Sequence, residues 1–149
     1  TEDKLAKLKP EFKALVEKLL DLGYANGNNP QVSSGLRTPE EQNELYAKGR
    51  TEKGTKITNA RAWESLHQYG IAVDLFFLVD GKADFTTSSY QLLWELACKA
   101  GLDRQDLMWS GLWTGSLRET AHFQLGSPDW RELYQAHLVS SKKFPTNIA

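Results

Sequence analysis

Apolar residues recur at helical spacing in several parts of the chain, and each of these parts is bounded by residues that begin or end helices. Between residues 10 and 22, apolar side chains follow the i, i+3, i+4, i+7, i+8 pattern of an amphipathic helix, and Gly23 is placed to end it. The segment 38–41 (TPEE) predicts a second helix that ends near Lys48. It combines a capping threonine, a proline at the first helical position and a glutamate three residues after the cap.

Two further helices are expected in the second half of the chain. One begins at residues 88–91 (SSYQ) and ends before Gly101. It carries Cys98, the one cysteine of the chain, which we interpret as a small buried thiol. The last helix begins at residues 127–128 (SP), and its apolar face holds His137, which we interpret as a hydrogen-bonded histidine of the core.

Strand patterns lie between these helices. Four short stretches qualify, at residues 31–36, 71–79, 107–109 and 121–125. The dipeptide 80–81 (DG) follows the longest of them and predicts a tight turn, whereas the long polar segment 49–63 is typical of a binding or mobile loop. Helices and strands do not alternate in a βαβ rhythm. We therefore expect an α+β fold with a small, mostly antiparallel sheet flanked by about four helices.

The composition of the chain excludes several kinds of binding partner and site. A chain of 149 residues is expected to form one domain, residues 1–149, and its formal net charge of −1 argues against a general nucleic-acid binder. A single cysteine excludes an intrachain disulfide and a cysteine-rich metal site. Apolar runs all fall short of the ~20 residues that span a bilayer, so we expect no stable membrane insertion, and a monomer is the default.

The strand at residues 71–79 holds an acidic residue in an apolar setting. Alternation places Ile71 and Val73 on one face, toward the core, and Asp74 on the other. A buried carboxylate without a partner is costly, so Asp74 needs a cation, and a metal would satisfy it. His67 lies on the loop just before this strand and is a second candidate ligand.

A second histidine lies in a strand with an acidic residue close before it. In the segment 119–125 (ETAHFQL), His122 and Gln124 face one way, and Glu119 lies at the mouth of the strand. Two imidazoles and a carboxylate can bind a divalent metal and leave a position open for a water, whose pKa the metal lowers to roughly 7. Glu119 would then accept the proton as this water attacks a carbonyl.

Arg37 ends the first strand candidate directly before a helix. A fixed positive charge there can hold a substrate carboxylate or stabilise the oxyanion of a tetrahedral intermediate. Each feature also has a plainer interpretation when it is taken alone. Arg37 can pair with Glu40 or Glu41 on the surface, and a histidine seven residues before an aspartate occurs by chance in many chains.

Four segments in a fixed order make the pattern more specific. They are residues 34–38 (SGLRT), 42–50 (QNELYAKGR), 65–74 (SLHQYGIAVD) and 119–124 (ETAHFQ). Together they resemble the L-alanyl-D-glutamate endopeptidases of phage endolysins and bacterial cell-wall hydrolases. These are relatives of the D-alanyl-D-alanine carboxypeptidases and dipeptidases and, more distantly, of the hedgehog signalling domain. The resemblance covers about residues 8–138 and implies a small α+β domain, a Zn²⁺ cofactor and a substrate in the peptide stem of peptidoglycan.

The resemblance also implies roles for single residues. Its pattern S-x-H-x-x-G-x-A-x-D makes His67 and Asp74 zinc ligands, and the histidine of its acidic-x-x-H motif corresponds to His122. Glu119 is then the implied general base. Arg37 is the implied group that binds and polarises the scissile carbonyl.

Three further residues are expected to contact the substrate. Gln42 and Ser65 correspond to motif positions near it. The segment 109–115 (WSGLWTG) stands where many relatives have W-G-G-x-W, so we expect Trp109 and the loop after it to border the cleft. This departure from the family pattern concerns substrate preference more than catalysis.

The resemblance favours a zinc metallopeptidase that cleaves the L-Ala–D-Glu bond, either as an endolysin or as a cell-wall remodelling enzyme. Three alternatives stay open: a D,D-carboxypeptidase acting on terminal D-Ala, a non-haem iron oxygenase, which uses the same kinds of ligand, and a non-catalytic zinc-bearing binding module.

The N-terminal segment bears on where the protein acts. Residues 1–9 are charged and lack the apolar stretch of a secretory signal, although a signal removed earlier would leave the same sequence. We expect a protein made in the host cytoplasm that acts on the cell wall, with holin-assisted release if it is a phage lysis protein.

Overall fold

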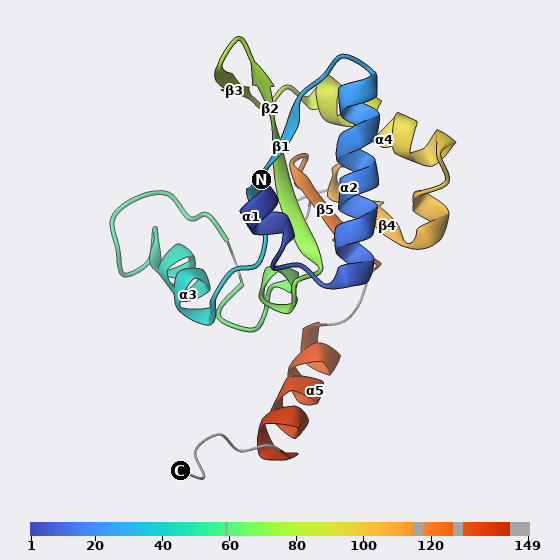
Figure 1. The fold of residues 1–149 in the computed structure, drawn as a ribbon. Coiled ribbons are helices and arrows are strands. Elements are labelled where there is room, and N and C mark those ends of the chain that lie inside the picture. The colour runs from blue at the N-terminus through green and yellow to red at the C-terminus, as the bar shows by residue number, and fades with distance from the viewer. Residues whose placement is uncertain (59, 115–117, 127–129, 144–149) are drawn as a thin grey trace.

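A five-stranded antiparallel sheet forms the centre of the molecule in the computed structural model (Figure 1), which describes residues 1–58, 60–114, 118–126 and 130–143. The strands are β1 (Pro30–Ser34), β2 (Ala72–Val79), β3 (Lys82–Asp84), β4 (Leu107–Trp109) and β5 (His122–Leu125). Their order is β1-β2-β5-β4, and β3 pairs with the end of β2 as a hairpin. This sheet confirms the expected α+β class.

Five α-helices and three short 3-10 helices accompany the sheet in the described part of the chain. The α-helices are α1 (Glu2–Leu5), α2 (Pro10–Ala25), α3 (Pro39–Ala47), α4 (Thr87–Lys99) and α5 (Trp130–Lys143). The 3-10 helices are η1 (Leu66–Tyr69), η2 (Asp103–Gln105) and η3 (Ser110–Leu112). The sequence predicted four helices and missed α1, because a four-residue helix is too short to show an apolar period.

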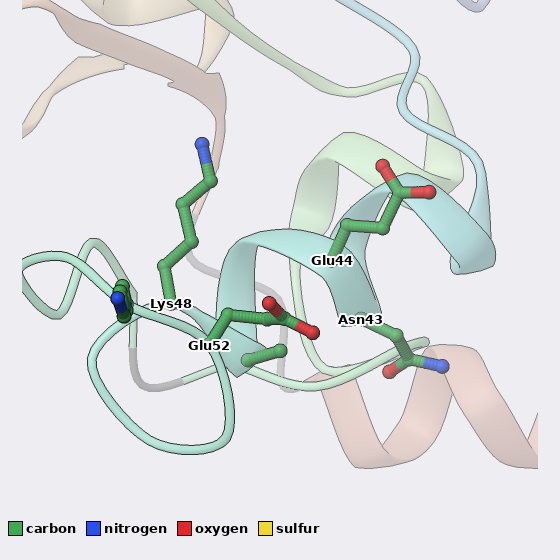
Figure 2. Close-up of a pocket in the computed structure, with 6 residues that line it drawn as sticks. Asn43, Glu44, Lys48 and Glu52 are labelled. Carbon is green, nitrogen blue, oxygen red and sulfur yellow. The ribbon is translucent and has the colours of Figure 1, made fainter.

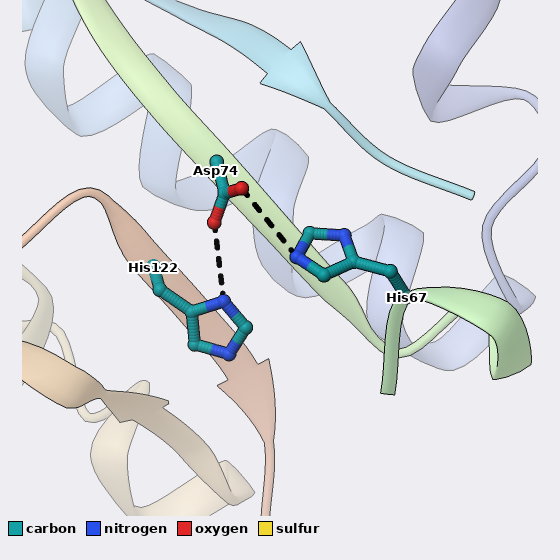
Figure 3. A group of neighbouring side chains, drawn as sticks. All are labelled: His67, Asp74 and His122. Atoms are coloured by element: carbon teal, nitrogen blue, oxygen red, sulfur yellow. Dashed lines mark hydrogen bonds and ion pairs between the residues drawn. The ribbon is translucent and has the colours of Figure 1, made fainter. Parts of the chain in front are cut away.

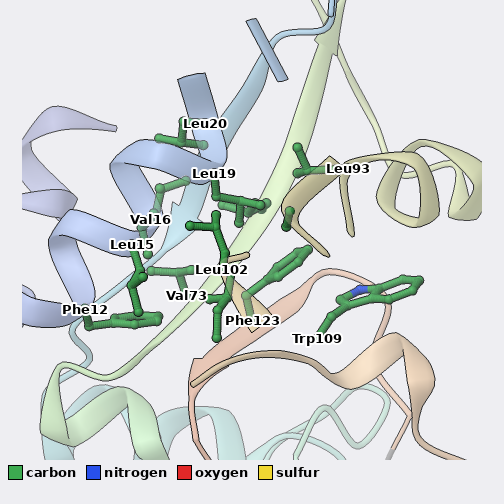
Figure 4. Packing of buried hydrophobic residues seen from close by; sticks show 14 of the residues in the cluster. Phe12, Leu15, Val16, Leu19, Leu20, Val73, Leu93, Leu102, Trp109 and Phe123 are labelled. Carbon is green, nitrogen blue, oxygen red and sulfur yellow. The ribbon is translucent and has the colours of Figure 1, made fainter. Parts of the chain in front are cut away.

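The hydrophobic core lies between one face of the sheet and the helices α2 and α4 (Figure 4). Alternate residues of β2 point into it, and the apolar stripe of α2 packs against them, as the sequence patterns predicted. The buried members from these three elements are Phe12, Leu15, Val16, Leu19, Leu20, Val73, Leu75, Phe77, Tyr90, Leu93 and Ala97. Burial of each large side chain stabilises the folded state by about 1.5–3 kcal/mol. The opposite face of β2 is not part of this core, so it can carry polar residues.

Helix α2 does not end at Gly23, as the sequence suggested. It continues to Ala25, and Gly23 lies inside its last turn. A Cβ atom at Gly23 would lie 2.6 Å from Cγ of Pro30 and 3.4 Å from a methyl group of Leu93. The glycine therefore allows α2 to approach β1 and α4 closely, and its role is in packing rather than in ending the helix.

The predicted helix starts are partly confirmed. The capping box at α3 forms, with Thr38 accepting from the backbone N–H of Glu41 and the Glu41 carboxylate accepting in return. Helix α4 begins at Thr87, one residue before the predicted start. The predicted start of the last helix, at residues 127–128, lies outside the described residues.

The tight turn at residues 80–81 is confirmed. Asp80 and Gly81 both have positive φ, at 50° and 76°, and they join β2 to β3.

The expectation that His137 belongs to the core was wrong. Its side chain is only half-buried and stacks on the Trp63 ring at a centroid distance of 4.1 Å, away from the main core. No helix of the described residues is both long and apolar enough to cross a bilayer.

Candidate metal centre

The register of three neighbouring strands brings the candidate site together. Asp74 lies in the central strand β2, opposite Ser34 of β1 on one side and opposite His122 of β5 on the other. Residues directly opposite each other in an antiparallel pair have Cβ atoms about 4.5–5.5 Å apart. The pairing of β2 with β5 alone therefore places the Asp74 carboxylate beside the His122 imidazole.

A β-bulge in β1 supplies the third position of this row. Val32 pairs with Leu75, but the next pair joins Ser34 to Asp74, so Ser33 is the extra residue. Strict alternation would turn Ser34 to the core side with Val32. The bulge shifts Ser34 by one position and aims its hydroxyl at the site.

The second histidine is held by a capped turn. His67 lies in η1, where the Ser65 hydroxyl accepts a hydrogen bond from the His67 backbone N–H at 3.3 Å. Gly70 ends the turn in the left-handed conformation, with φ of 71°. The carbonyl of His67 also accepts from the backbone N–H of Arg37 at 3.1 Å, which ties the turn to the segment after β1.

These elements bring the three candidate ligands into one cluster (Figure 3). Asp74 lies between the two histidines: Oδ1 is 3.1 Å from His122 Nδ1, and Oδ2 is 3.5 Å from His67 Nε2. All three donor atoms lie within 4.8 Å of one another. Both histidines are buried, at 4% and 9% exposure.

Each imidazole is fixed by an acceptor on its other nitrogen. His67 Nδ1 lies 2.9 Å from the carbonyl oxygen of Gly35, and His122 Nε2 lies 3.0 Å from Oε1 of Gln124. The Gln124 amide is itself oriented, because its nitrogen donates to the carbonyl of Gly126. A proton on each of these ring nitrogens leaves a lone pair on His67 Nε2 and on His122 Nδ1.

Those two lone pairs face the same carboxylate. Lone pairs and a carboxylate repel one another unless a cation or a proton lies between them, so this donor set fits a divalent metal. Such fixing of metal-ligating histidines through their second nitrogen is a common feature of metal sites.

The charges of the cluster shift two pKa values in opposite directions. Burial of the Asp74 carboxylate would raise its pKa, but hydrogen bonds to His122 and His67, together with their charges, outweigh burial and hold the pKa well below its ordinary value. Burial lowers the pKa of His122, whereas the Asp74 carboxylate raises it, and the net effect is upward. The carboxylate is therefore ionised at neutral pH and available to a cation.

Arg37 lies beside the cluster and is held from two sides. Its Nη1 donates to Gln42 Oε1 at 2.7 Å, and its Nη2 donates to the Ser34 hydroxyl at 2.9 Å. Nη2 is also 3.7 Å from Oδ2 of Asp74. Its carboxylate partner is thus Asp74, so the plainer interpretation of a surface pair with Glu40 or Glu41 was wrong.

The cluster opens into a cavity of ≈ 720 Å³, to which Arg37, Ser65 and Glu119 also contribute. The Glu119 side chain is 65% exposed, and its Oε2 is 3.9 Å from His122 Nδ1. This carboxylate therefore lies beside the ligand set and in contact with solvent. Ile57, Thr58 and Ala60 form part of the wall, in agreement with a binding role for the segment 49–63.

Two residues predicted to contact the substrate lie elsewhere. Trp109 is 3% exposed and packs in the core against Phe123, while its indole N–H donates to the carbonyl of Thr120 at 2.7 Å. Trp113, from the same loop, lines the cavity instead. Gln42 is fully buried behind Arg37 and cannot reach a substrate.

A second hollow lies on the outer side of α3, next to the loop that follows it (Figure 2). Its volume is ≈ 480 Å³, and charged residues of both signs line it, among them Glu44, Lys48 and Glu52. It contains none of the three cluster residues. The candidate metal ligands therefore all lie in the larger cavity.

Sequence patterns singled out the cluster but did not predict the hydrogen bonds that orient it. The strand period of two placed Gln124 on the same face as His122, but it did not show that the Gln124 amide contacts the imidazole. Ser34 could not have been found in this way, because the bulge reverses its alternation. Gly35 acts through its backbone carbonyl, a group that every residue has, so the sequence could not single it out.

Known proteins share both sequence and fold with this chain. A family model described as VanY, D-alanyl-D-alanine carboxypeptidase, matches residues 5–102. The peptidoglycan L-alanyl-D-glutamate endopeptidase CwlK of Bacillus subtilis is 40% identical over 67 residues, which are 45% of this chain and 40% of that protein. The match thus spans less than half of that relative.

Solved structures extend the likeness over nearly the whole chain. The L-Ala D-Glu endopeptidase ChiX of Serratia marcescens has a TM-score of 0.64 at 23% identity, covering 89% of this chain and 88% of its own. The vancomycin resistance D,D-pentapeptidase VanY, solved in complex with Zn(II), has a TM-score of 0.55 at 21% identity, covering 86% of this chain and 78% of its own. At these identities the structures establish a shared fold.

Proposed function

This chain belongs to the VanY family of D-alanyl-D-alanine carboxypeptidases, and on that premise we propose that it is a zinc-dependent peptidase that hydrolyses the L-Ala–D-Glu bond of the peptidoglycan stem. The observation that carries the proposal is the His67–Asp74–His122 cluster, set in a cavity beside one cationic and one acidic side chain. The choice of bond is supported by the endopeptidase relatives CwlK and ChiX.

Zinc is the metal that this donor set suits best. Two imidazoles and a carboxylate leave a fourth position of a tetrahedron open, which is the usual arrangement of a catalytic zinc site. When bound, zinc supplies Lewis acidity and lowers the pKa of a coordinated water. His67 would contribute Nε2, His122 Nδ1 and Asp74 a carboxylate oxygen, because these atoms face one another.

Glu119 is the residue placed to move protons. Its carboxylate lies at the cavity edge, 3.9 Å from the ligand nitrogen of His122, and outside the ligand set. This position beside the ligand set allows Glu119 to accept the proton of the attacking water. The same group can then donate it to the leaving amine.

Arg37 is the residue placed to stabilise negative charge on the substrate. Its guanidinium faces the cavity beside Asp74, and its hydrogen bonds to Ser34 and Gln42 fix its position before a substrate arrives. A preorganised donor of this kind stabilises the oxyanion that develops when a carbonyl is attacked. Removal of one such donor typically costs about 10²–10³ in kcat.

A D,D-carboxypeptidase acting on terminal D-Ala is the second candidate, and the description of the family favours it. Mass spectrometry of muropeptides digested with the zinc-loaded protein separates the two. Cleavage of the proposed bond releases a peptide that begins with D-Glu and leaves L-Ala on the glycan. Loss of a single D-Ala, with the rest of the stem intact, would instead establish the carboxypeptidase.

Two more remote candidates make different predictions. A non-haem iron oxygenase would contain iron after purification, so metal analysis of the protein as isolated distinguishes it from a zinc peptidase. A non-catalytic zinc-bearing module would bind zinc and leave every muropeptide unchanged. The exposed Glu119 carboxylate beside the cluster favours hydrolysis over both.

A further inference from the structure

A fully buried glutamine lies behind the catalytic cavity. Gln42 is on α3, has 0% exposure and touches no part of the cavity surface. Three hydrogen bonds engage both lone pairs of its amide oxygen and one of its two amide N–H groups. Its Oε1 accepts from Arg37 Nη1 at 2.7 Å and from Gln68 Nε2 at 3.2 Å, and its Nε2 donates to the carbonyl of Ala60 at 2.6 Å.

The three partners belong to three parts of the site. Arg37 provides the guanidinium that faces the substrate, Gln68 lies in η1 next to His67, and Ala60 belongs to the cavity wall. One amide group thus connects the cation, the turn of a candidate metal ligand and the substrate-binding wall.

The chemistry of this position favours glutamine over its nearest substitutes. It must accept two hydrogen bonds and donate one, which an amide can do and a carboxylate cannot. An apolar side chain of equal length would leave polar groups of Arg37 and Ala60 without this partner, which destabilises the fold around them. A glutamate would also place a negative charge against the guanidinium and reduce its attraction for a developing oxyanion.

An arginine side chain has many rotamers and loses conformational entropy when it is fixed in one of them. In this site Gln42 and Ser34 hold the guanidinium of Arg37 from two sides. The side chain therefore loses this entropy when the protein folds, and no further loss is required in the transition state. Ser34 lies opposite Asp74 in the neighbouring strand β1, whereas Gln42 acts from the buried side.

We propose that Gln42 is a positioning residue, which raises turnover by holding the Arg37 guanidinium in its catalytic orientation. The proposal rests on the proposed peptidase function for its kinetic consequence, but the orientation of Arg37 is independent of any substrate. The hydrogen bonds of the Gln42 side chain go to Arg37, Ala60 and Gln68, and none of these is a candidate metal ligand.

A double-mutant cycle on the zinc-loaded protein tests it. Gln42→Met keeps the length of the side chain and removes its hydrogen bonds, and we expect kcat on a stem peptide to fall about tenfold with KM within about threefold. In the background of Arg37→Ala the same substitution should change kcat less than about twofold, because its effect passes through the guanidinium. An equal loss in both backgrounds would overturn the proposal.

Asn43 offers a matched control. It is the next residue of α3, and its Oδ1 accepts from the backbone N–H of Ala62, so it anchors the same wall segment without touching Arg37. Asn43→Ala should leave kcat within about twofold. If it lowers kcat as much as Gln42→Met does, anchoring of the wall explains the result and the positioning role is refuted.

Nuclear magnetic resonance of the Arg37 side chain gives a readout that needs no catalysis. In the parent protein the guanidinium NηH₂ groups should rotate slowly and give separate signals. In Gln42→Met the rotation should become fast and average these signals. Gln42→Glu keeps the acceptor for Arg37, so its signals should again be separate. Unchanged Arg37 signals in a folded, zinc-loaded Gln42→Met protein would refute the proposal. If the parent protein cuts a different stem bond, only the proposed function fails, and the cycle is run on that bond.

Discussion

The candidate metal ligands depend on neighbours that decide which atom each of them offers. His67 Nδ1 is engaged by the carbonyl of Gly35, and His122 Nε2 is engaged by Gln124. The remaining nitrogens meet at Asp74. The metal site therefore depends both on the identity of its ligands and on the hydrogen bonds that orient their rings.

Substitution of Gln124 tests this orientation. Gln124→Met removes the acceptor for His122 Nε2, so the ring loses its preferred tautomer, and we expect zinc affinity to fall about 10–100-fold. Competition with a chromogenic chelator measures the affinity. Gln91→Met, at an exposed position of α4, serves as the control and should bind zinc like the parent. Equal affinity in the Gln124 variant would show that the hydrogen bond does not orient the ligand.

Glu119 is expected to act in the reaction and not in binding the metal. Glu119→Ala should keep the fold and the zinc content but lose at least about a hundredfold in kcat, the usual contribution of a general base. Rates on a stem peptide, with metal content measured on the same samples, provide the check. Glu44→Ala, in the second hollow, is the matched control and should retain near-parental activity. Undiminished turnover in the Glu119 variant would remove the assigned mechanism.

At the scale of elements, close contacts between α2, β1 and α4 set the geometry of the sheet that carries the site. Gly23 lies at a close approach of these elements, since a Cβ atom there would overlap the ring of Pro30. A pyrrolidine ring cannot rotate away as a flexible side chain can. Pro30 also begins β1, so a shift at Gly23 would be passed to the strand that ends at the bulge beside Asp74.

The effect of Gly23→Ala therefore distinguishes packing from helix propensity. Alanine in a helix interior is ordinarily better than glycine by about 0.5–1 kcal/mol, but overpacking costs about 1–3 kcal/mol, so we expect a net loss of stability. Chemical denaturation measures the free energy of unfolding. Ala14→Gly, at an exposed position of the same helix, calibrates the propensity effect alone. A gain in stability for Gly23→Ala would contradict the close contact.

At the scale of the whole molecule, the sheet separates the core from the chemistry. The α2 and α4 side is apolar, and the other side carries Asp74 and His122 in the central strands. The family match confirms the resemblance read from the four motifs, and the fold neighbours agree with it. One domain over residues 1–149, action at the cell wall and release through a holin stay predictions.

The charges of the cluster predict how stability depends on pH. The depressed pKa of Asp74 stabilises the fold above its ordinary value of 3.8, and this contribution is lost as the pH falls below it. The raised pKa of His122 stabilises the fold below its ordinary value of 6.5, and that contribution is lost as the pH rises. Metal-free protein should thus be most stable between these values and become less stable toward pH 8.

Zinc should reverse this trend, because its ligands must be deprotonated and its binding strengthens with pH. Thermal unfolding with chelator and with zinc, at pH 6 and pH 8, measures both effects. We expect the zinc-induced rise in Tm to be larger at pH 8. Asp74→Asn is the control, since it should abolish both the pH trend and the rise. Metal-free protein that gains stability from pH 6 to pH 8 would contradict the assigned pKa directions.

Individual residues show how much of the candidate site could be predicted from the sequence. Asp74 stood out because a carboxylate in an apolar strand needs a partner, and that argument requires no coordinates. Trp109 and Gln42 were misplaced, because adjacency to a motif does not reveal whether a side chain turns toward the cleft or away from it. One lies in the core and the other lies behind Arg37.

The sequence by itself determined the α+β class, the apolar faces of α2 and β2, and the residues with the chemistry to bind a metal. These follow from local periodicity and from the side-chain types, which are properties of the chain alone. Only the tertiary structure decided that His67, Asp74 and His122 meet, that a bulge turns Ser34 toward them, and that Gln42 holds Arg37. Strand register, bulges and buried hydrogen bonds join residues far apart in the chain, and these contacts arise only when the sheet and the core form together.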